Sequence, residues 1–221
     1  MDCSSNLHCP IILWLSFKGL DEVRAGLVLA GGRSSRFGFR DKSLFKLDGT
    51  PLILHVLERM EKSVDEVVIS LSDDRQRWYI SKILEGRDIK IVIDEIREYG
   101  PIGGINASIK VIDSESLLIV GCDMPHLNPD VVDLLFGLLE GYDAAIPVWE
   151  NGFLEGLHSV YNRDALLHAT PECIRLGERR ILDLIRRLNV RYVPVKEIRR
   201  IDPELKTFTN INRPEDYRIL Y

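Results

Sequence analysis

The sequence lacks several features that would indicate particular classes of protein. Its four cysteines form no CxxC pair and no Cys/His cluster with the spacing of a zinc site. Basic residues are not in excess, because 29 Lys and Arg stand against 34 Asp and Glu, a formal net charge of −5. Non-specific binding to nucleic acid needs a basic surface that releases counterions, so we expect no nucleic-acid partner. A polyanionic substrate must instead be met by local cations or a metal ion.

Long hydrophobic runs are also missing. The apolar stretch 10–17 is much shorter than the roughly 20 residues that a membrane-spanning helix needs. A secretory signal begins with positive charge, whereas Asp2 precedes the first basic residue, Lys18. We therefore expect no membrane partner and a cytoplasmic location. Residues 1–22 are expected to be a poorly ordered N-terminal extension, and residues 23–221 one domain.

Apolar runs and helical patterns alternate along this domain. Residues 24–30 form an apolar run that stops at two glycines, as a buried parallel strand does. Thr50 is expected to cap a helix over 52–62, with Pro51 at its first position. Further strands are expected over 66–71, 89–93, 116–120, 143–147, 153–161 (antiparallel), 191–195 and 208–210, and further helices over 73–84, 101–112, 129–139, 163–169, 179–188 and 214–221. This order predicts an α/β fold with a mostly parallel sheet covered on both faces, whose ligands bind beyond the carboxyl ends of the strands.

The loop after the first strand, residues 29–42, carries the strongest ligand-binding signal. Gly31 and Gly32 let the backbone approach a ligand and offer N–H groups to phosphate oxygens. Arg36 can grip a phosphate with two hydrogen bonds, and Lys42 adds a mobile positive charge. The spacing fits neither the GxGxxG dinucleotide pattern nor the GxxxxGK[ST] pattern of P-loops. We interpret the loop as a phosphate site rather than a glycine-rich turn with solvated charges.

The spacing of this loop resembles that of a known family. The pattern GG-x₃-R-x-G-x₃-K, followed by LDGTPL at 47–52, looks like the opening of the MobA-type nucleotidyltransferases, which include the molybdenum cofactor guanylyltransferases. The resemblance continues through GPIGG at 100–104, CDMP at 122–125 and NINRPED at 210–216. It covers nearly everything from residue 24 onward. It implies a three-layer α/β/α, Rossmann-like nucleotidyltransferase fold.

The resemblance also implies a reaction, a cofactor and partners. It implies transfer of GMP from GTP to molybdopterin with release of pyrophosphate, Mg²⁺ as the cofactor, and transient contact with other molybdenum cofactor enzymes. In the family the aspartate of the C-D-x-P motif is the metal ligand, and Asp123 occupies that position. A carboxylate just past a strand can hold Mg²⁺ on triphosphate oxygens, although it could also cap a turn. Catalysis is assigned to Arg36 and Lys42, which would hold phosphates, and to Asp123, which would place the metal. The residues expected at the nucleotide are Leu29, Ala30, Gly31, Gly32, Lys42, Ser70, Asp94 and Asp123.

The identity of the base is open. Where the guanylyltransferases carry an asparagine that helps to read the base, this chain has Ser70. A hydroxyl can make one of those hydrogen bonds but not the pair that an amide makes. The use of CTP therefore stands as an alternative to GTP. Two further alternatives stand beside the guanylyl transfer: another phosphorylated acceptor, such as a sugar, isoprenoid or lactate derivative, and a nucleotide-binding protein without catalysis.

Three further features each have two interpretations. His158 either faces the acceptor or is a structural residue of an apolar strand, and the second is favoured. Residues 177–180 (GERR) either offer cations to an acceptor phosphate or form a solvated helix face. Asn212 lies either near the metal or at a capped strand end. A Ser/His/Asp triad is not visible in the sequence, and the reaction does not need one, because the acceptor phosphate is itself a nucleophile.

Overall fold

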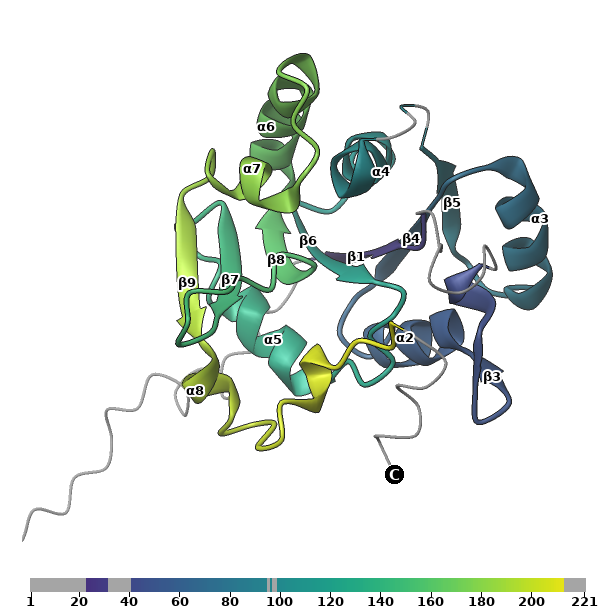
Figure 1. Cartoon of the computed structure of the whole chain (residues 1–221), viewed down its shortest axis with the longest axis horizontal. Coiled ribbons are helices and arrows are strands. Elements are labelled where there is room, and N and C mark those ends of the chain that lie inside the picture. Colours follow the sequence, from purple (N-terminus) through teal and green to yellow (C-terminus); the bar gives the residue numbers. More distant parts are fainter. Residues whose placement is uncertain (1–22, 32–40, 95, 97–98, 213–221) are drawn as a thin grey trace, which may run out of the picture.

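The computed structural model describes residues 23–31, 41–94, 96 and 99–212. A seven-stranded sheet in the order β5-β4-β1-β6-β8-β7-β9 forms its centre (Figure 1). The strands are β1 (Arg24–Leu29), β4 (Glu66–Leu71), β5 (Lys90–Ile93), β6 (Ser116–Gly121), β7 (Ala144–Val148), β8 (His158–Asn162) and β9 (Val190–Pro194). Strand β8 runs antiparallel to both of its neighbours, and the other pairings are parallel. The predicted mostly parallel sheet is therefore confirmed.

Helices cover both faces of this sheet. They are α2 (Leu52–Met60), α3 (Asp74–Ile83), α4 (Gly100–Ser108), α5 (Pro129–Gly137), α6 (Arg163–Arg175), α7 (Ile181–Ile185) and α8 (Val195–Ile198). One core contains apolar side chains from α2, α3, α5 and α8, and the other contains side chains from α4, α6 and α7. Figure 1 shows α4, α6 and α7 on one side of the sheet and α2 and α5 on the other. This is the three-layer α/β/α arrangement that the resemblance implied.

Strand β1 shows why the apolar run folds as a central strand. Val28 points into one core, whereas Ala25 and Leu27 point into the other. Full burial of one Leu or Val side chain contributes roughly 1.5–3 kcal/mol, so a strand buried on both faces needs apolar residues throughout. A side chain at Gly26 would overlap the side chain of Met60. Glycine at this position therefore lets α2 pack closely on the strand.

The first predicted helix begins at Leu52 as expected, but its predicted cap at Thr50 is wrong. Residues Lys46–Leu47 (β2) and Thr50–Pro51 (β3) form a small antiparallel hairpin in which Leu47 pairs with Thr50. Its two-residue turn, Asp48 and Gly49, has φ values of 50° and 83°, as in the type I′ turns that favour Asp-Gly. Thr50 is therefore a strand residue rather than the N-cap. Pro51 directly precedes the first helical residue, and no side chain caps this helix.

The region after β7 also differs from the prediction. The predicted strand 208–210 is wrong, because a 3₁₀ helix, η3 (Lys206–Phe208), occupies its first position. Leu205 turns the chain with φ of 53°, and the Thr207 N–H donates to Asp202 Oδ2 at 2.8 Å. Both features oppose an extended strand.

Several boundaries also differ in this region. The antiparallel strand begins at His158 rather than at residue 153, and only an isolated bridge at Leu154 precedes it. Helix α6 continues beyond residue 169 to Arg175, and residue Val195 starts α8 instead of ending a strand. The predicted helix 214–221 lies outside the described residues.

Four strands of the parallel half end at the same edge of the sheet, and backbone hydrogen bonds join their ends. The N–H groups of Ala30 and Gly31 donate to the Ser70 carbonyl at 3.0 and 3.1 Å. The Cys122 N–H donates to the Leu29 carbonyl at 3.2 Å. This edge is where a ligand of such a sheet is expected. Within the described part of the chain, no helix is long and apolar enough to cross a bilayer.

Candidate functional site

Lys42 and Asp123 meet at this edge. Lys42 is the first residue of the 3₁₀ helix η2 (Lys42–Leu44), and Asp123 lies two residues beyond β6. The Lys42 Nζ is 2.5 Å from Asp123 Oδ2 and 3.0 Å from Asn212 Oδ1. The two charged side chains are only 17% and 23% exposed, so water screens their attraction less than that of a surface pair. The sequence predicted both residues at the site, and the structure brings them together.

The turn before Lys42 is fixed by its own capping residue. Asp41 Oδ1 accepts hydrogen bonds from the Ser43 N–H at 2.9 Å and from Ser43 Oγ at 2.6 Å. This is N-cap geometry, which satisfies a donor at the start of η2. Asp41 therefore directs the chain so that Lys42 points to β6.

Asp123 is held from two sides. A Cβ at Gly121 would overlap Asp123 Oδ1, so the glycine provides the space in which the carboxylate lies. The Asp123 carbonyl accepts a hydrogen bond from the Ile211 N–H at 2.9 Å. Ile211 is buried in a small apolar cluster with Leu47 and Leu52. The segment that carries Asn212 is thus attached to the same aspartate.

Ser70 and Asp94 form a second group at the ends of β4 and β5, next to α4. A Cβ at Gly104 would lie 2.6 Å from Ser70 Oγ and 3.1 Å from Leu29 Cδ2. A Cβ at Gly103 would lie 2.5 Å from Asp94 Oδ2. The two glycines therefore let α4 lie directly against these side chains. Glycine costs a helix about 1 kcal/mol relative to alanine, and two in succession are the signal that indicates such a close approach.

Burial also shapes the acid–base behaviour of this edge. It raises the pKa of Asp94, and the hydrogen bond from the Ile96 N–H acts in the opposite direction. Burial and the neighbouring Asp123 charge raise the pKa of the Cys122 thiol well above its usual range. Cys122 therefore stays protonated and is a core thiol, not a nucleophile.

Gln76 is a residue of this edge that sequence reasoning missed. Its Nε2 donates to the Ala30 carbonyl at 2.8 Å, and its Oε1 accepts from the Ser72 N–H at 2.9 Å. The side chain thereby joins the ends of β1 and β4. Asp73 accepts from the Gln76 N–H at 2.8 Å, so D-x-x-Q at 73–76 resembles a capping box. That spacing was the available signal.

The predicted site residues follow the order of the strands. Along the edge lie Asp94 after β5, Ser70 in β4, Leu29 to Gly31 at the end of β1, and Asp123 after β6. Gly32 and Arg36 lie outside the described residues. Their predicted phosphate contacts remain predictions.

The oxygen atoms near Lys42 suit a hard cation. Asp123 offers a carboxylate and Asn212 a carboxamide oxygen, both bonded to the same ammonium group. Among the described residues, no three His, Cys, Asp or Glu side chains gather as a metal-binding group. Mg²⁺ commonly binds through one or two carboxylates together with substrate phosphates and water. The donor set therefore fits Mg²⁺ carried by a phosphorylated ligand.

His158 is enclosed by the core. It is fully buried, and its Nε2 lies 3.1 Å from Thr207 Oγ1. Burial lowers the pKa of His158 to about 3, so the ring is neutral at physiological pH. These contacts agree with the structural interpretation of this histidine and leave it without access to an acceptor.

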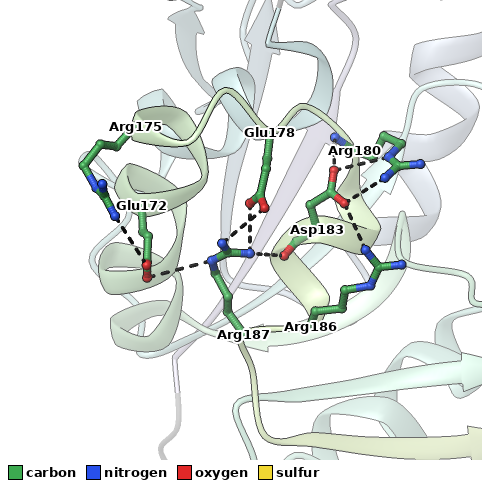
Figure 2. A network of polar contacts seen from close by, with 7 residues as sticks. All are labelled: Glu172, Arg175, Glu178, Arg180, Asp183, Arg186 and Arg187. Carbon is green, nitrogen blue, oxygen red and sulfur yellow. Dashed lines mark hydrogen bonds and ion pairs between the residues drawn. The ribbon is translucent and has the colours of Figure 1, made fainter.

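The GERR segment lies in a network of charged side chains around α6 and α7 (Figure 2). Asp183, in α7, accepts hydrogen bonds from the guanidinium groups of Arg180 and Arg186 at 3.1 and 3.4 Å. Arg187 pairs with Glu178 at 2.9 Å. The Arg180 side chain is still 73% exposed, so it belongs to a solvated face that is nevertheless ordered by a buried carboxylate.

Comparison with known proteins gives consistent results. The family model described as "MobA-like NTP transferase domain" matches residues 26–192. The "probable molybdenum cofactor guanylyltransferase" of Methanosarcina mazei is 38% identical over 197 residues, which cover 87% of this chain and 88% of that protein. The protein of the same name from Methanosarcina acetivorans is 39% identical over 204 residues, or 90% of each chain.

A solved structure agrees with the sequence matches. The crystal structure of molybdopterin-guanine dinucleotide biosynthesis protein A from Archaeoglobus fulgidus is 32% identical and superposes with a TM-score of 0.75. The match covers 88% of this chain and 95% of that one. Sequence and fold thus agree over most of the length of both chains.

Proposed function

The chain belongs to the MobA-like NTP transferase family, and from this membership we propose that it transfers GMP from GTP to molybdopterin. The products are pyrophosphate and the guanine dinucleotide form of the cofactor. The names of the Methanosarcina and Archaeoglobus proteins support the nucleotide and the acceptor. The observation that carries the proposal is the contact of Lys42 with Asp123 and Asn212. It places a lysine that can bind phosphate next to oxygen atoms that can bind a metal ion, at the end of the parallel strands.

The reaction needs positioning and charge stabilisation more than acid–base chemistry. An oxygen of the acceptor's terminal phosphate forms a bond to the α-phosphorus of the nucleotide. The bond from this phosphorus to the oxygen that bridges to the β-phosphate breaks, and pyrophosphate leaves with the electron pair. The attacking oxygen is already anionic, so no protein base has to remove a proton. Lys42, with Arg36 from the same loop, would hold the phosphates and offset the charge that develops on them.

Mg²⁺ dependence is part of the proposal. The ion would supply positive charge to the triphosphate as pyrophosphate leaves. Asp123 would hold it, with the Asn212 oxygen beside the carboxylate. Lys42 would then turn from Asp123 to the phosphates. An ion pair that is partly exposed and made by a flexible lysine permits such an exchange of partners.

The other group of residues would meet the base and the ribose. Leu29, Ala30 and Gly31 supply backbone at the end of β1, and Ser70 and Asp94 supply an hydroxyl and a carboxylate next to α4. Guanine offers N–H donors that a carboxylate accepts well. Ser70 can add one hydrogen bond, so we expect Asp94 and the backbone to contribute more of the base selection.

Release of pyrophosphate from each of the four nucleoside triphosphates tests the proposal. The full chain would be assayed with and without molybdopterin, and with Mg²⁺ or with a chelator. We expect turnover with GTP when molybdopterin and Mg²⁺ are both present. Turnover with CTP alone would contradict the choice of base. No turnover with any nucleotide would contradict catalysis and favour a binding protein.

A further inference from the structure

The segment 205–212 crosses from one half of the molecule to the other. It begins after α8 and forms η3, and in Figure 1 it runs in yellow from α8 past α5 toward α2. Its far end is fixed at the proposed active site. The Ile211 N–H donates to the Asp123 carbonyl at 2.9 Å, and Asn212 Oδ1 lies 3.0 Å from Lys42 Nζ.

The near end of the segment is fixed in the core by one hydroxyl group. Thr207 is fully buried, and its Oγ1 lies 3.1 Å from His158 Nε2. The same oxygen accepts a hydrogen bond from the Asn128 N–H at 3.0 Å. The hydroxyl thus joins the segment to the first residue of β8 and to the N-cap of α5.

The ring of His158 adds a second contact to the segment. It packs edge to face against Phe208, with the ring centroids 4.9 Å apart. On its own strand, His158 pairs with Val120 of β6, the strand that leads to Asp123. The histidine therefore touches both the strand that leads to Asp123 and the segment that returns to this aspartate.

Stability alone does not explain a histidine at this place. Burying two polar groups gains little over an apolar pair of the same shape, and either group left alone is costly. A hydrogen bond in the core instead permits one register of the segment and excludes neighbouring ones. Only four residues lie between Thr207 and Asn212, so a shift of the anchor would move the amide away from Lys42.

We propose that Thr207, held by His158 and by the Asn128 N–H, is a positioning residue for the transfer reaction: its hydroxyl fixes the 205–212 segment so that Asn212 reaches Lys42 and Asp123. This inference rests on the proposed function. His158 itself touches no reacting atom, because the core encloses it. Its effect reaches the Asn212 amide through the backbone of the four residues that lie between Thr207 and Asn212.

A set of matched threonine variants tests the role. Thr207→Val removes the hydroxyl and keeps the shape, whereas Thr207→Ser keeps the hydroxyl. Thr170→Val is the control, since Thr170 is also fully buried and bonds the Leu166 carbonyl and Asn106 within the α4–α6 contact. We expect Thr207→Val to lower kcat about tenfold or more, because small misplacements of a catalytic group have effects of that size or greater. The KM for GTP should change little. Thr207→Ser should restore most of the lost turnover, and Thr170→Val should lower the Tm without this fall in kcat.

A double-mutant cycle with Asn212→Ala separates positioning from general destabilisation. If the hydroxyl acts through Asn212, Thr207→Val should lower kcat much less in a chain that already lacks the amide. Equal fold-changes in both backgrounds would overturn the inference.

Hydrogen exchange of the Ile211 amide gives a readout that needs no substrate. We expect this amide to exchange faster in Thr207→Val than in the wild type, Thr207→Ser or Thr170→Val. Unchanged exchange of this amide in Thr207→Val would overturn the inference, whether or not the wild type is active. A wild type that is inactive with GTP would count against the proposed function alone. Should Thr207→Val fail to fold, Phe208→Leu, which removes the ring contact to His158, should produce the same faster exchange and fall in kcat. A Phe208→Leu chain with normal exchange and turnover would contradict the proposal.

Discussion

Two clusters of paired acidic and basic side chains differ in how many basic groups bind the central carboxylate. At the strand ends, Asp123 forms an ion pair with one flexible side chain, Lys42, and its carboxylate lies beside Gly121. Around α7, Asp183 receives the guanidinium groups of two arginines, Arg180 and Arg186, and also the Arg180 N–H at 3.2 Å (Figure 2).

The difference separates a pair that can change partners from a network that is complete. Arginine presents a planar fork that binds a carboxylate in a fixed geometry, whereas lysine is a mobile point charge. A carboxylate surrounded by arginines has little capacity left for a metal ion. We therefore expect substitutions at the first cluster to change the reaction, and substitutions at the second to change stability.

The largest effect is expected for Lys42→Ala. Loss of a cation that acts mainly in the transition state should lower kcat about a hundredfold or more, by analogy with removal of one oxyanion-hole donor. Pyrophosphate release at saturating GTP measures it. Lys82→Ala is the control, because Lys82 lies over the Trp78 ring on the outer side of α3. Near-normal turnover of Lys42→Ala would remove the distinction between the two clusters.

Asp123→Asn should mainly weaken the response to Mg²⁺. The amide keeps the size of the side chain but loses the charge that a hard cation prefers. We expect the Mg²⁺ concentration for half-maximal turnover to rise at least about tenfold, the lower end of the effects seen for groups that only support a ligand. Asp133→Asn is a matched control, since Asp133 pairs with Arg24 at 3.0 Å with similar exposure at the start of β1. An equal response in both variants would argue against a metal at Asp123.

Asp183→Asn should lower the Tm at neutral pH. The pKa of Asp183 lies below its usual range, chiefly because of the hydrogen bond from the Arg180 side chain. A lowered pKa contributes stability above the ordinary Asp value of about 3.9, and this contribution disappears as the pH falls through the folded-state value. The difference in Tm between wild type and variant should therefore shrink in acid. Asp164→Asn, which removes a mostly exposed carboxylate that pairs with Arg163, should show a smaller difference in Tm. A larger difference would show that Asp183 does not organise its network.

The smallest effect is expected for Glu155→Gln. The Glu155 carboxylate accepts its hydrogen bond from a neutral donor, the Trp149 indole. Burial raises the pKa of Glu155, while the hydrogen bond from Trp149 Nε1 at 2.7 Å acts in the opposite direction. Ionisation of Glu155 therefore destabilises the folded state, and the free energy of unfolding of the wild type falls as the pH rises through the raised pKa. The variant should have a slightly higher Tm than the wild type at pH 7, and this advantage should vanish toward pH 4. Thermal unfolding across this range measures it, with Glu204→Gln, an exposed pair with Lys206, as the control. An advantage that grew in acid would contradict the assignment.

Much of the fold could be predicted because the central strands are apolar on both faces. The run 24–30 and the glycines after it predicted the position of β1. The spacing within the loop 29–42 indicated Lys42, and the place of Asp123 just after a strand, together with the family resemblance, indicated the aspartate. The meeting of these two side chains follows from the rule that parallel strands end at one edge. These inferences depend on local patterns joined by one topological principle.

What could not be predicted depends on contacts between distant segments. The close approach of Gly103 to Asp94 and of Gly104 to Ser70 requires knowledge of how α4 lies on the sheet. The strand expected at 208–210 was wrong because Asp202 and Leu205 impose a turn that the apolar pattern does not reveal.

The first hairpin was missed for a different reason, because two local sequence patterns predicted different structures. The Asp48-Gly49 turn was visible in the sequence, but Thr50-Pro51 also fits the start of a helix. Two local rules competed there, and the turn determined the outcome.

The contact between Lys42 and Asn212 also has a consequence for biosynthesis. The two residues are separated by 170 positions, and the strands of the sheet all lie before Asn212. At translation rates of roughly 5–20 residues per second, Asn212 is added roughly 10–30 s after Lys42. The last strand of the sheet, β9, ends at Pro194, so the amide that contacts Lys42 is synthesised only after every strand of the sheet.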